Sequence, residues 1–253
     1  MSGSNGWEMQ LADGDPTLLH ELDCLNDPRG HFWVWGGVDY QNDCRSDHFS
    51  FNSAYLDDIS GDEHMAWQVA HELLSLFNGA VALFMKNAYP FRLLAVLHNG
   101  DNTSYVEKQT PVGLLGPLAP KPGRPKDLGS SASIFRVLAL ACEYPDAYLI
   151  IKILDQKEGW VSYYKILETV EAYSSKYHLD IPVDKDSHRS FKLTANNFSI
   201  SGLDSRHGFK EQIKEIKTPA MSLESAYDFI TSYIRAYLVA RYGNSLSQLP
   251  AAV

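Results

Sequence analysis

Residues 222–243 read Ser-Leu-Glu-Ser-Ala-Tyr-Asp-Phe-Ile-Thr-Ser-Tyr-Ile-Arg-Ala-Tyr-Leu-Val-Ala-Arg-Tyr-Gly. Apolar side chains recur in this stretch every three or four residues, which is the period of one helix face. Ser222 is a good N-terminal cap, and Gly243 suits the residue that follows a last helical turn. The stretch therefore predicts one long helix. Its apolar face must be buried by other helices or by a second copy of the chain, and we expect the same of its tyrosines, Tyr227, Tyr233, Tyr237 and Tyr242.

Four segments upstream show the same helical period. They cover residues 131–144, 145–154, 160–177 and 188–196. Pro145 fits the first turn of the second segment, and Pro182 stops any continuation of the third. Residues 131–253 therefore predict an all-α bundle of four or five helices.

The composition changes sharply between residues 111 and 130, which contain Pro111, Pro117, Pro120, Pro122 and Pro125 together with four glycines. Such a stretch makes neither a helix nor a central strand. We interpret residues 111–130 as a linker that separates an N-terminal domain, residues 1–110, from the helical domain, residues 131–253. Lys121, Arg124 and Lys126 would make this linker a basic arm.

The N-terminal domain is predicted to be β-rich with one prominent helix. Residues 7–59 read as strands and turns, with strands at 31–35 and 48–55, Gly36-Gly37 as a turn or bulge, and a turn at residues 13–16. Residues 62–78 show the helical period, and Asn78-Gly79 is a good C-terminal stop. Residues 80–85 read either as a short strand or as a continuation of the helix. Residues 91–108 predict a hairpin that turns at Asn99-Gly100 or Gly100-Asp101. The predicted fold class is α+β.

The totals exclude some classes of function. The net charge of −9, from 22 basic and 31 acidic residues, argues against non-specific electrostatic binding of nucleic acid by the whole chain. It does not exclude a local basic surface. Three scattered cysteines support neither a disulfide framework nor a zinc site, and His64, His71 and Glu72 lack metalloprotease spacing. We predict no metal and no cofactor. We expect a cytoplasmic protein without a membrane segment, since no signal-peptide pattern or long apolar run is visible.

The candidate site is the polar stretch at residues 194–208, which carries the adjacent pair Arg206-His207. Metal-independent RNA cleavage needs a base near neutral pKa and a cation that stabilises the charged phosphorane. His207 and Arg206 are suitable residue types, and Asn196, Asn197 and Asp204 would assist. The alternative is structural: Arg206 pairs with a carboxylate such as Glu168 or Glu171, and His207 ties the loop to backbone carbonyls.

Three segments of the helical half carry a family resemblance: residues 160–168, residues 191–197 leading to 205–208, and residues 219–226. Together they resemble uncharacterised bacterial proteins with a C-terminal HEPN-like helical bundle. The resemblance implies a bundle that forms a homodimer and takes part in prokaryotic immunity, toxin–antitoxin or RNA-processing systems. Active HEPN ribonucleases place several residues between an Arg and a His, whereas Arg206 and His207 are adjacent. Nuclease activity therefore does not follow from the resemblance.

Three functions stay open from the sequence. The first is a bacterial HEPN-like binding and dimerisation protein in phage defence or stress response, with RNA, a nucleotide or another protein as partner. The second is a metal-independent ribonuclease that uses Arg206 and His207. The third is a nucleotide-binding or nucleotidyl-transfer partner in a toxin–antitoxin pair. An exposed apolar patch on the helix at residues 222–242 would favour the first as an interaction module. An exposed Arg206-His207 pair lining a groove would favour the second, and burial of Arg206 against Glu168 or Glu171 would favour a structural role for the loop.

Overall fold

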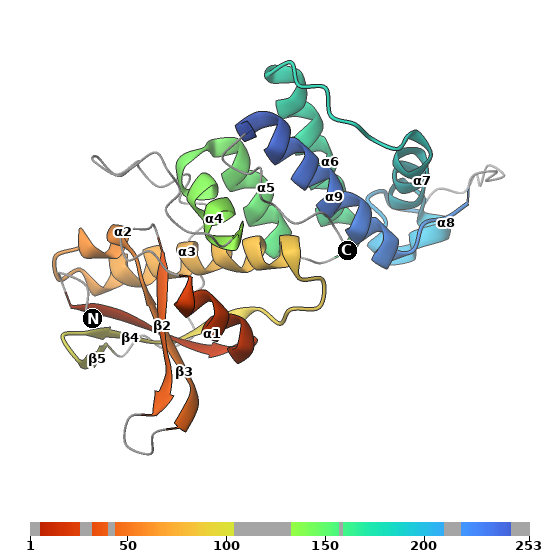
Figure 1. The fold of residues 1–253 in the computed structure, drawn as a ribbon. Coiled ribbons are helices and arrows are strands. Elements are labelled where there is room, and N and C mark those ends of the chain that lie inside the picture. Colours follow the sequence, from red (N-terminus) through yellow and green to blue (C-terminus); the bar gives the residue numbers. More distant parts are fainter. Residues whose placement is uncertain are drawn as a thin grey trace. The chain divides into compact units, whose positions relative to one another are not determined.

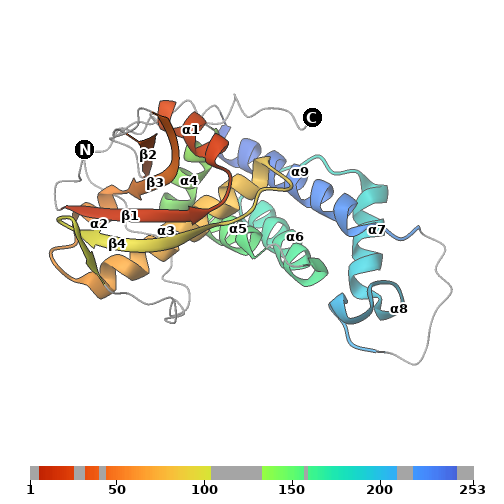
Figure 2. The ribbon, with the colours of Figure 1, turned by 90° about the horizontal axis from the view of Figure 1, so that it is seen from below.

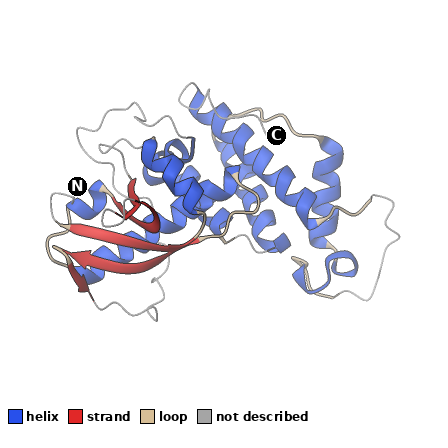
Figure 3. Ribbon diagram, turned by 60° about the horizontal axis from the view of Figure 1, so that its bottom comes forward, coloured by secondary structure: helices blue, strands red, loops and turns tan. Residues whose placement is uncertain are grey.

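The computed structural model describes residues 6–25, 32–39, 44–103, 133–156, 159–209 and 219–243. The chain forms two compact units, Met1–Tyr148 and Leu149–Val253. The strands lie in the first unit, and the described part of the second is helical, which confirms the α+β class (Figure 3). The predicted linker, residues 111–130, and its basic arm lie outside the described residues.

The first unit contains one five-stranded antiparallel sheet with the order β2-β3-β1-β4-β5. Alternation along β1 shows its two faces, because Trp7, Met9 and Leu11 are buried while the residues between them are partly exposed. The strands are β1 (Trp7–Asp13), β2 (Trp33–Asp39), β3 (Cys44–Asn52), β4 (Phe91–His98) and β5 (Asp101–Thr103).

Helix α3 (Glu63–Phe84) runs along one face of this sheet (Figures 1 and 2). The aromatic core between them includes Phe32, whose ring stacks on Phe51 at 4.5 Å and on Phe77 at 4.9 Å between centroids. Phe77 in turn lies 5.4 Å from Phe91 of β4. The remaining helices of this unit are α1 (Pro16–Cys24), α2 (Ala54–Asp57) and α4 (Ser133–Glu143), the last of which packs against α3.

The prediction of strands and turns alone between residues 7 and 59 is wrong at two places. Helix α1 begins directly after the predicted turn, because the Asp15 side chain accepts a hydrogen bond from the Thr17 backbone N–H and Pro16 occupies the first helical position. Strand β3 ends at Asn52, and Ser53 then caps α2, so Tyr55 lies in a helix. The sequence pattern predicts Asp15 as part of a turn and Ser53 as part of a strand, whereas each is the N-terminal cap of a helix.

The predicted stop of helix α3 at Asn78-Gly79 is wrong, and the alternative of a continued helix over residues 80–85 is correct, because α3 ends at Phe84. The Asn78 side chain is buried and caps nothing in its own helix. Its Nδ2 donates to the Phe91 carbonyl oxygen and its Oδ1 accepts from the Phe91 N–H, both at 2.9 Å. The Asn78 amide thus satisfies the backbone groups of Phe91 at the start of β4, as a neighbouring strand would. Because the side chain does not cap the helix, α3 continues past it.

The two glycine-based predictions in the sheet are confirmed. Asn99 and Gly100 both have positive φ, at 53° and 89°, and join β4 to β5 in the tight turn that such a pair favours. The pairing of β2 with β3 shifts register between Gly36 and Val38, which is a bulge. The part of the predicted hairpin after residue 103 lies outside the described residues.

Helix α5 (Pro145–Asp155) crosses the division between the units, and Pro145 occupies its first position as predicted. The second unit continues with α6 (Gly159–Lys176), α7 (Lys185–Asn196), the single turns α8 (Phe198–Ser201) and η1 (Gly202–Asp204), and α9 (Leu223–Tyr242). Helix α9 is capped by Ser222 and followed by Gly243, as the sequence predicts. Among the described helices, none combines the length and apolar character needed to cross a bilayer.

Helices α6 and α9 lie side by side and run in the same direction (Figure 1). Tyr163 and Tyr227 meet near the helix starts, and Tyr177 meets Arg241 near the helix ends. Burial and the neighbouring Tyr163 raise the pKa of Tyr227, so its hydroxyl stays protonated. Of the four tyrosines predicted to be buried, Tyr227, Tyr233 and Tyr237 lie in the core, whereas Tyr242 is partly exposed.

Candidate functional site

The candidate loop folds back onto the helix that precedes it. Asn197 ends α7 and also caps α8, because its Oδ1 accepts from the Ser199 N–H at 3.0 Å. Gly202 then reverses the chain with φ of 58°, and the Arg206 N–H donates to the carbonyl oxygen of Ala195 at 2.8 Å. The Ser201 hydroxyl donates to the Thr194 carbonyl oxygen and closes the same turn. These contacts fix where the Arg206 side chain begins.

The Arg206 guanidinium lies against α6. Its Nη2 is 2.9 Å from Glu168 Oε1, and its Cζ lies 4.2 Å from the centre of the Tyr164 ring. About a third of the Arg206 side chain (35 %) and about half of the Glu168 side chain (48 %) are exposed. The ion pair is one of the two that the structural interpretation predicts. Ion pairing and ring stacking together anchor the loop to α6.

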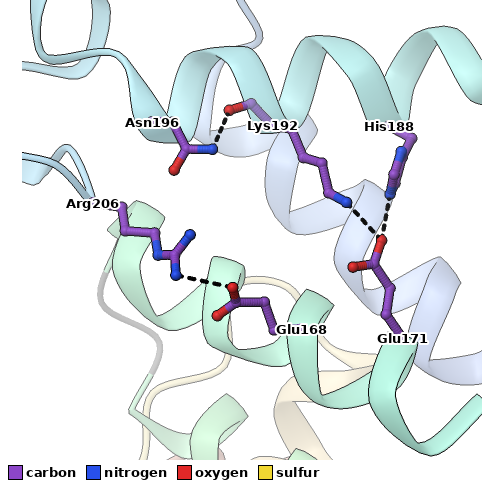
Figure 4. A network of polar contacts seen from close by, with 6 residues as sticks. All are labelled: Glu168, Glu171, His188, Lys192, Asn196 and Arg206. Atoms are coloured by element: carbon purple, nitrogen blue, oxygen red, sulfur yellow. Dashed lines mark hydrogen bonds and ion pairs between the residues drawn. The ribbon is translucent and has the colours of Figure 1, made fainter.

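A second ion-pair group lies one turn further along α6 (Figure 4). Glu171 Oε1 accepts hydrogen bonds from Lys192 Nζ and His188 Nε2, both at 2.8 Å. Burial acts to raise the pKa of Glu171, but the hydrogen bonds and charges of Lys192 and His188 outweigh it, so the pKa lies below its ordinary value. The carboxylate therefore stays ionised at neutral pH and joins α6 to α7.

The two asparagines have different roles. Asn196 Nδ2 donates to the Lys192 carbonyl oxygen at 2.9 Å, while its Oδ1 is buried without a hydrogen-bond partner. In Figure 4 the Asn196 amide lies on the α7 side of the Arg206–Glu168 pair. Asn197 is occupied as a helix cap. Of the predicted site residues, Arg206 and Glu168 form an ion pair, and Asn196 lies beside them, bonded to the backbone of its own helix.

His207 and Asp204 lie outside this network and are exposed. The His207 backbone is fixed by Ser205, whose hydroxyl donates to the His207 carbonyl oxygen at 2.8 Å and accepts from its N–H at 3.2 Å. Two apolar side chains of the same loop are strongly exposed: Leu203 at 94 % and Phe209 at 71 %. The rings of Phe198 and Phe209 meet edge to face. The loop thus combines an anchored arginine with exposed apolar residues.

Sequence reasoning missed Tyr164, His188 and Lys192 as members of this network. His188 and Lys192 are four residues apart and therefore share one face of α7, a spacing that could have been recognised. The sequence gives no indication that Tyr164 lies under Arg206, since Tyr164 belongs to the apolar stripe of its helix. Its ring stacks on Phe191, which is part of the buried core of this unit.

Within the described ranges, no group of three or more His, Cys, Asp or Glu side chains converges in a way that could hold a metal ion. What the arrangement offers is charged and polar groups paired with one another, beside a loop with exposed apolar residues. In comparisons with known proteins, the chain matched no family model, no curated protein and no solved structure.

Proposed function

We propose that this chain is a binding and dimerisation protein, and that residues 202–209, here called the display loop, form its contact surface. The observation that carries the proposal is the engagement of Arg206 by Glu168 and Tyr164. A loop held in this way keeps a fixed shape, and the loop exposes Leu203 and Phe209 to solvent. Exposed apolar side chains on a fixed loop are typical of protein contact sites.

The long helix α9 is a weaker candidate for the contact surface. Its exposed apolar residues, Leu223 and Val239, are each 43 % exposed and lie near opposite ends of the helix. Single exposed apolar residues of this kind are ordinary on protein surfaces. The proposal therefore assigns homodimer formation to the display loop of the helical unit.

The biological setting of the proposal rests on the sequence resemblance. The segments at residues 160–168, 191–197 and 219–226 lie on α6, α7 and the start of α9, which border the polar network. We propose a HEPN-like role for this unit in bacterial phage defence or stress response, in the cytoplasm, with RNA, a nucleotide or another protein as the further partner. The first unit would then recruit a partner or sense a signal.

The test is the mass of the purified 28.4-kDa chain in solution, measured by light scattering over a range of concentrations. We expect a dimer that becomes a monomer when Leu203→Ser and Phe209→Ser are combined. Leu223→Ser is the matched control, because it also removes an exposed apolar side chain, outside the display loop. A wild-type chain that stays monomeric at every concentration would contradict the proposal.

The ribonuclease alternative is favoured by one observation, the exposure of His207 next to the partly exposed Arg206. The Arg206 guanidinium would have to leave Glu168 before it could stabilise a phosphate. Labelled RNA incubated with chelator tests this alternative. Cleavage that is lost in both His207→Ala and Arg206→Ala, with both variants folded, would replace the binding proposal by an enzymatic one.

A further inference from the structure

The ends of α6 and α9 carry a cluster of tyrosines and cations, here called the tyrosine–cation cluster: Tyr173, Lys176, Tyr177, Arg241 and Tyr242. The rings of Tyr173 and Tyr177 stack at 5.9 Å with only 14° between their planes. Lys176 Nζ lies 5.5 Å and 5.2 Å from their centres. The Arg241 guanidinium lies 3.9 Å from the centre of Tyr177 and 5.2 Å from that of Tyr242. Aromatic faces and positive charge thus alternate across two helix ends.

This cluster differs from the other tyrosines of the unit. Tyr227, Tyr233 and Tyr237 are buried in the core, whereas Tyr173, Tyr177 and Tyr242 are partly exposed and Lys176 is exposed. Cations in the last turn of a helix also stabilise its negative C-terminal end, and Lys176 and Arg241 both occupy last turns. That role accounts for the two cations. It does not require three tyrosines at the surface around them.

We propose that the tyrosine–cation cluster binds single-stranded nucleic acid. Unpaired bases would stack on Tyr173 or Tyr242, because the Arg241 guanidinium already covers a face of Tyr177. Lys176 would contact the phosphate beside a stacked base, in the positive field that Arg241 reinforces. Proteins that bind single strands combine these two elements, an aromatic platform for bases and cations along the backbone. The cluster lies outside the display loop, so a test of dimerisation through that loop does not decide whether the cluster binds nucleic acid.

The chemistry of the cluster selects a single strand over a duplex. Bases inside a duplex are stacked on one another and present no free face to a tyrosine ring. Binding of a duplex would have to rely on charge alone, and the whole chain carries a net charge of −9. The two cations of the cluster can therefore support binding only where bases also stack on the tyrosine rings.

The experiment measures fluorescence anisotropy of a labelled oligouridine of about twelve nucleotides, at several salt concentrations. We expect binding that is weakened roughly tenfold by Tyr173→Ala, the range that one lost base stack gives. Lys176→Gln should weaken binding and lower the salt dependence by about one phosphate contact. Lys165→Gln is the matched control, because it removes one exposed lysine from the same helix and should change nothing.

A second readout protects the test against misfolding of the tyrosine variant. Oligouridine that carries 5-iodouridine is crosslinked to the wild-type chain by light, and the modified residues are mapped by mass spectrometry. We expect crosslinks at Tyr173 or Tyr242. The proposal is overturned by absence of binding at low salt, by equal affinity for a duplex of the same length, by equal effects of Lys176→Gln and Lys165→Gln, or by crosslinks only at other residues.

Discussion

Two asparagines, one in each unit, show how differently the two halves of this protein use buried polar groups. Asn78 lies inside α3, and both ends of its amide are paired with the backbone of Phe91. Asn196 lies in the last turn of α7, where only its Nδ2 is paired and its buried Oδ1 has no hydrogen-bond partner. The first amide fixes where a strand begins. The second is a local contact next to a surface ion pair.

The carboxylates follow the same division. Glu72 of α3 is buried and accepts a hydrogen bond from the Tyr148 hydroxyl within the first unit. Glu168 and Glu171 of α6 are 48 % and 34 % exposed, and each meets its cations at the surface. Buried polar contacts are costly to break, whereas exposed ion pairs contribute little to stability. We therefore expect substitutions of polar groups to matter more for folding in the first unit.

The largest effect is expected for Asn78→Ala. It removes two buried hydrogen bonds and leaves the N–H and carbonyl of Phe91 without their partner, which should lower the free energy of unfolding by about 2–3 kcal/mol. Asn196→Ala is the matched control in the other unit and should change the free energy by less than about 0.5 kcal/mol. Denaturant unfolding measures both. Equal losses would remove the contrast between the two amides.

A smaller loss, of about 1–2 kcal/mol, is expected for Tyr148→Phe, because the buried Glu72 then loses a hydrogen-bond donor. Tyr89→Phe removes the same hydroxyl from a side chain that is 78 % exposed, so it should leave the denaturation midpoint unchanged. If both variants unfold at the wild-type midpoint, the Glu72 contact contributes nothing to the core.

The smallest of these effects is expected for Glu171→Gln and depends on pH. The pKa of Glu171 is lower in the folded chain, so its contribution is present above the ordinary glutamate pKa of about 4.5 and is lost as the pH falls through the folded value. Near neutral pH we expect a loss of about 1 kcal/mol, discounted for the partial exposure of the pair. The difference from wild type should disappear in acid. Thermal unfolding at neutral and acid pH would show this, and a difference that grows in acid would contradict it.

Local patterns predict much of this fold, and non-local contacts account for most of what they miss. The α9 helix, the Asn99-Gly100 turn and the Gly36-Gly37 bulge follow from residues that lie next to one another. The continuation of α3 does not, because the partner of Asn78 is Phe91, on a strand that the local pattern cannot place against the helix. Helix α1 was missed for a different reason, since Asp15-Pro16 can either make a turn or begin a helix.

The candidate site shows the same limit. The pairing of Arg206 with Glu168 was one of two alternatives that charge alone allowed, and only the fold of the loop decides between them. The convergence of His188 and Lys192 on Glu171 depends on how α7 packs against α6, which the sequence does not give. The tyrosine–cation cluster depends on two helices far apart in the chain that end at the same place.

The parallel course of α6 and α9 has a consequence for how the second unit folds. Neighbouring helices in a simple up-and-down bundle are joined by short loops and can meet as soon as they form. Here α6 ends at Lys176 and α9 begins at Leu223, so the chain must close a long loop, with α7 inside it, before the two helices can meet. Loop closure costs conformational entropy before any contact compensates for it. We therefore expect this unit to fold more slowly than an up-and-down bundle of the same size, with the docking of α9 as a late step.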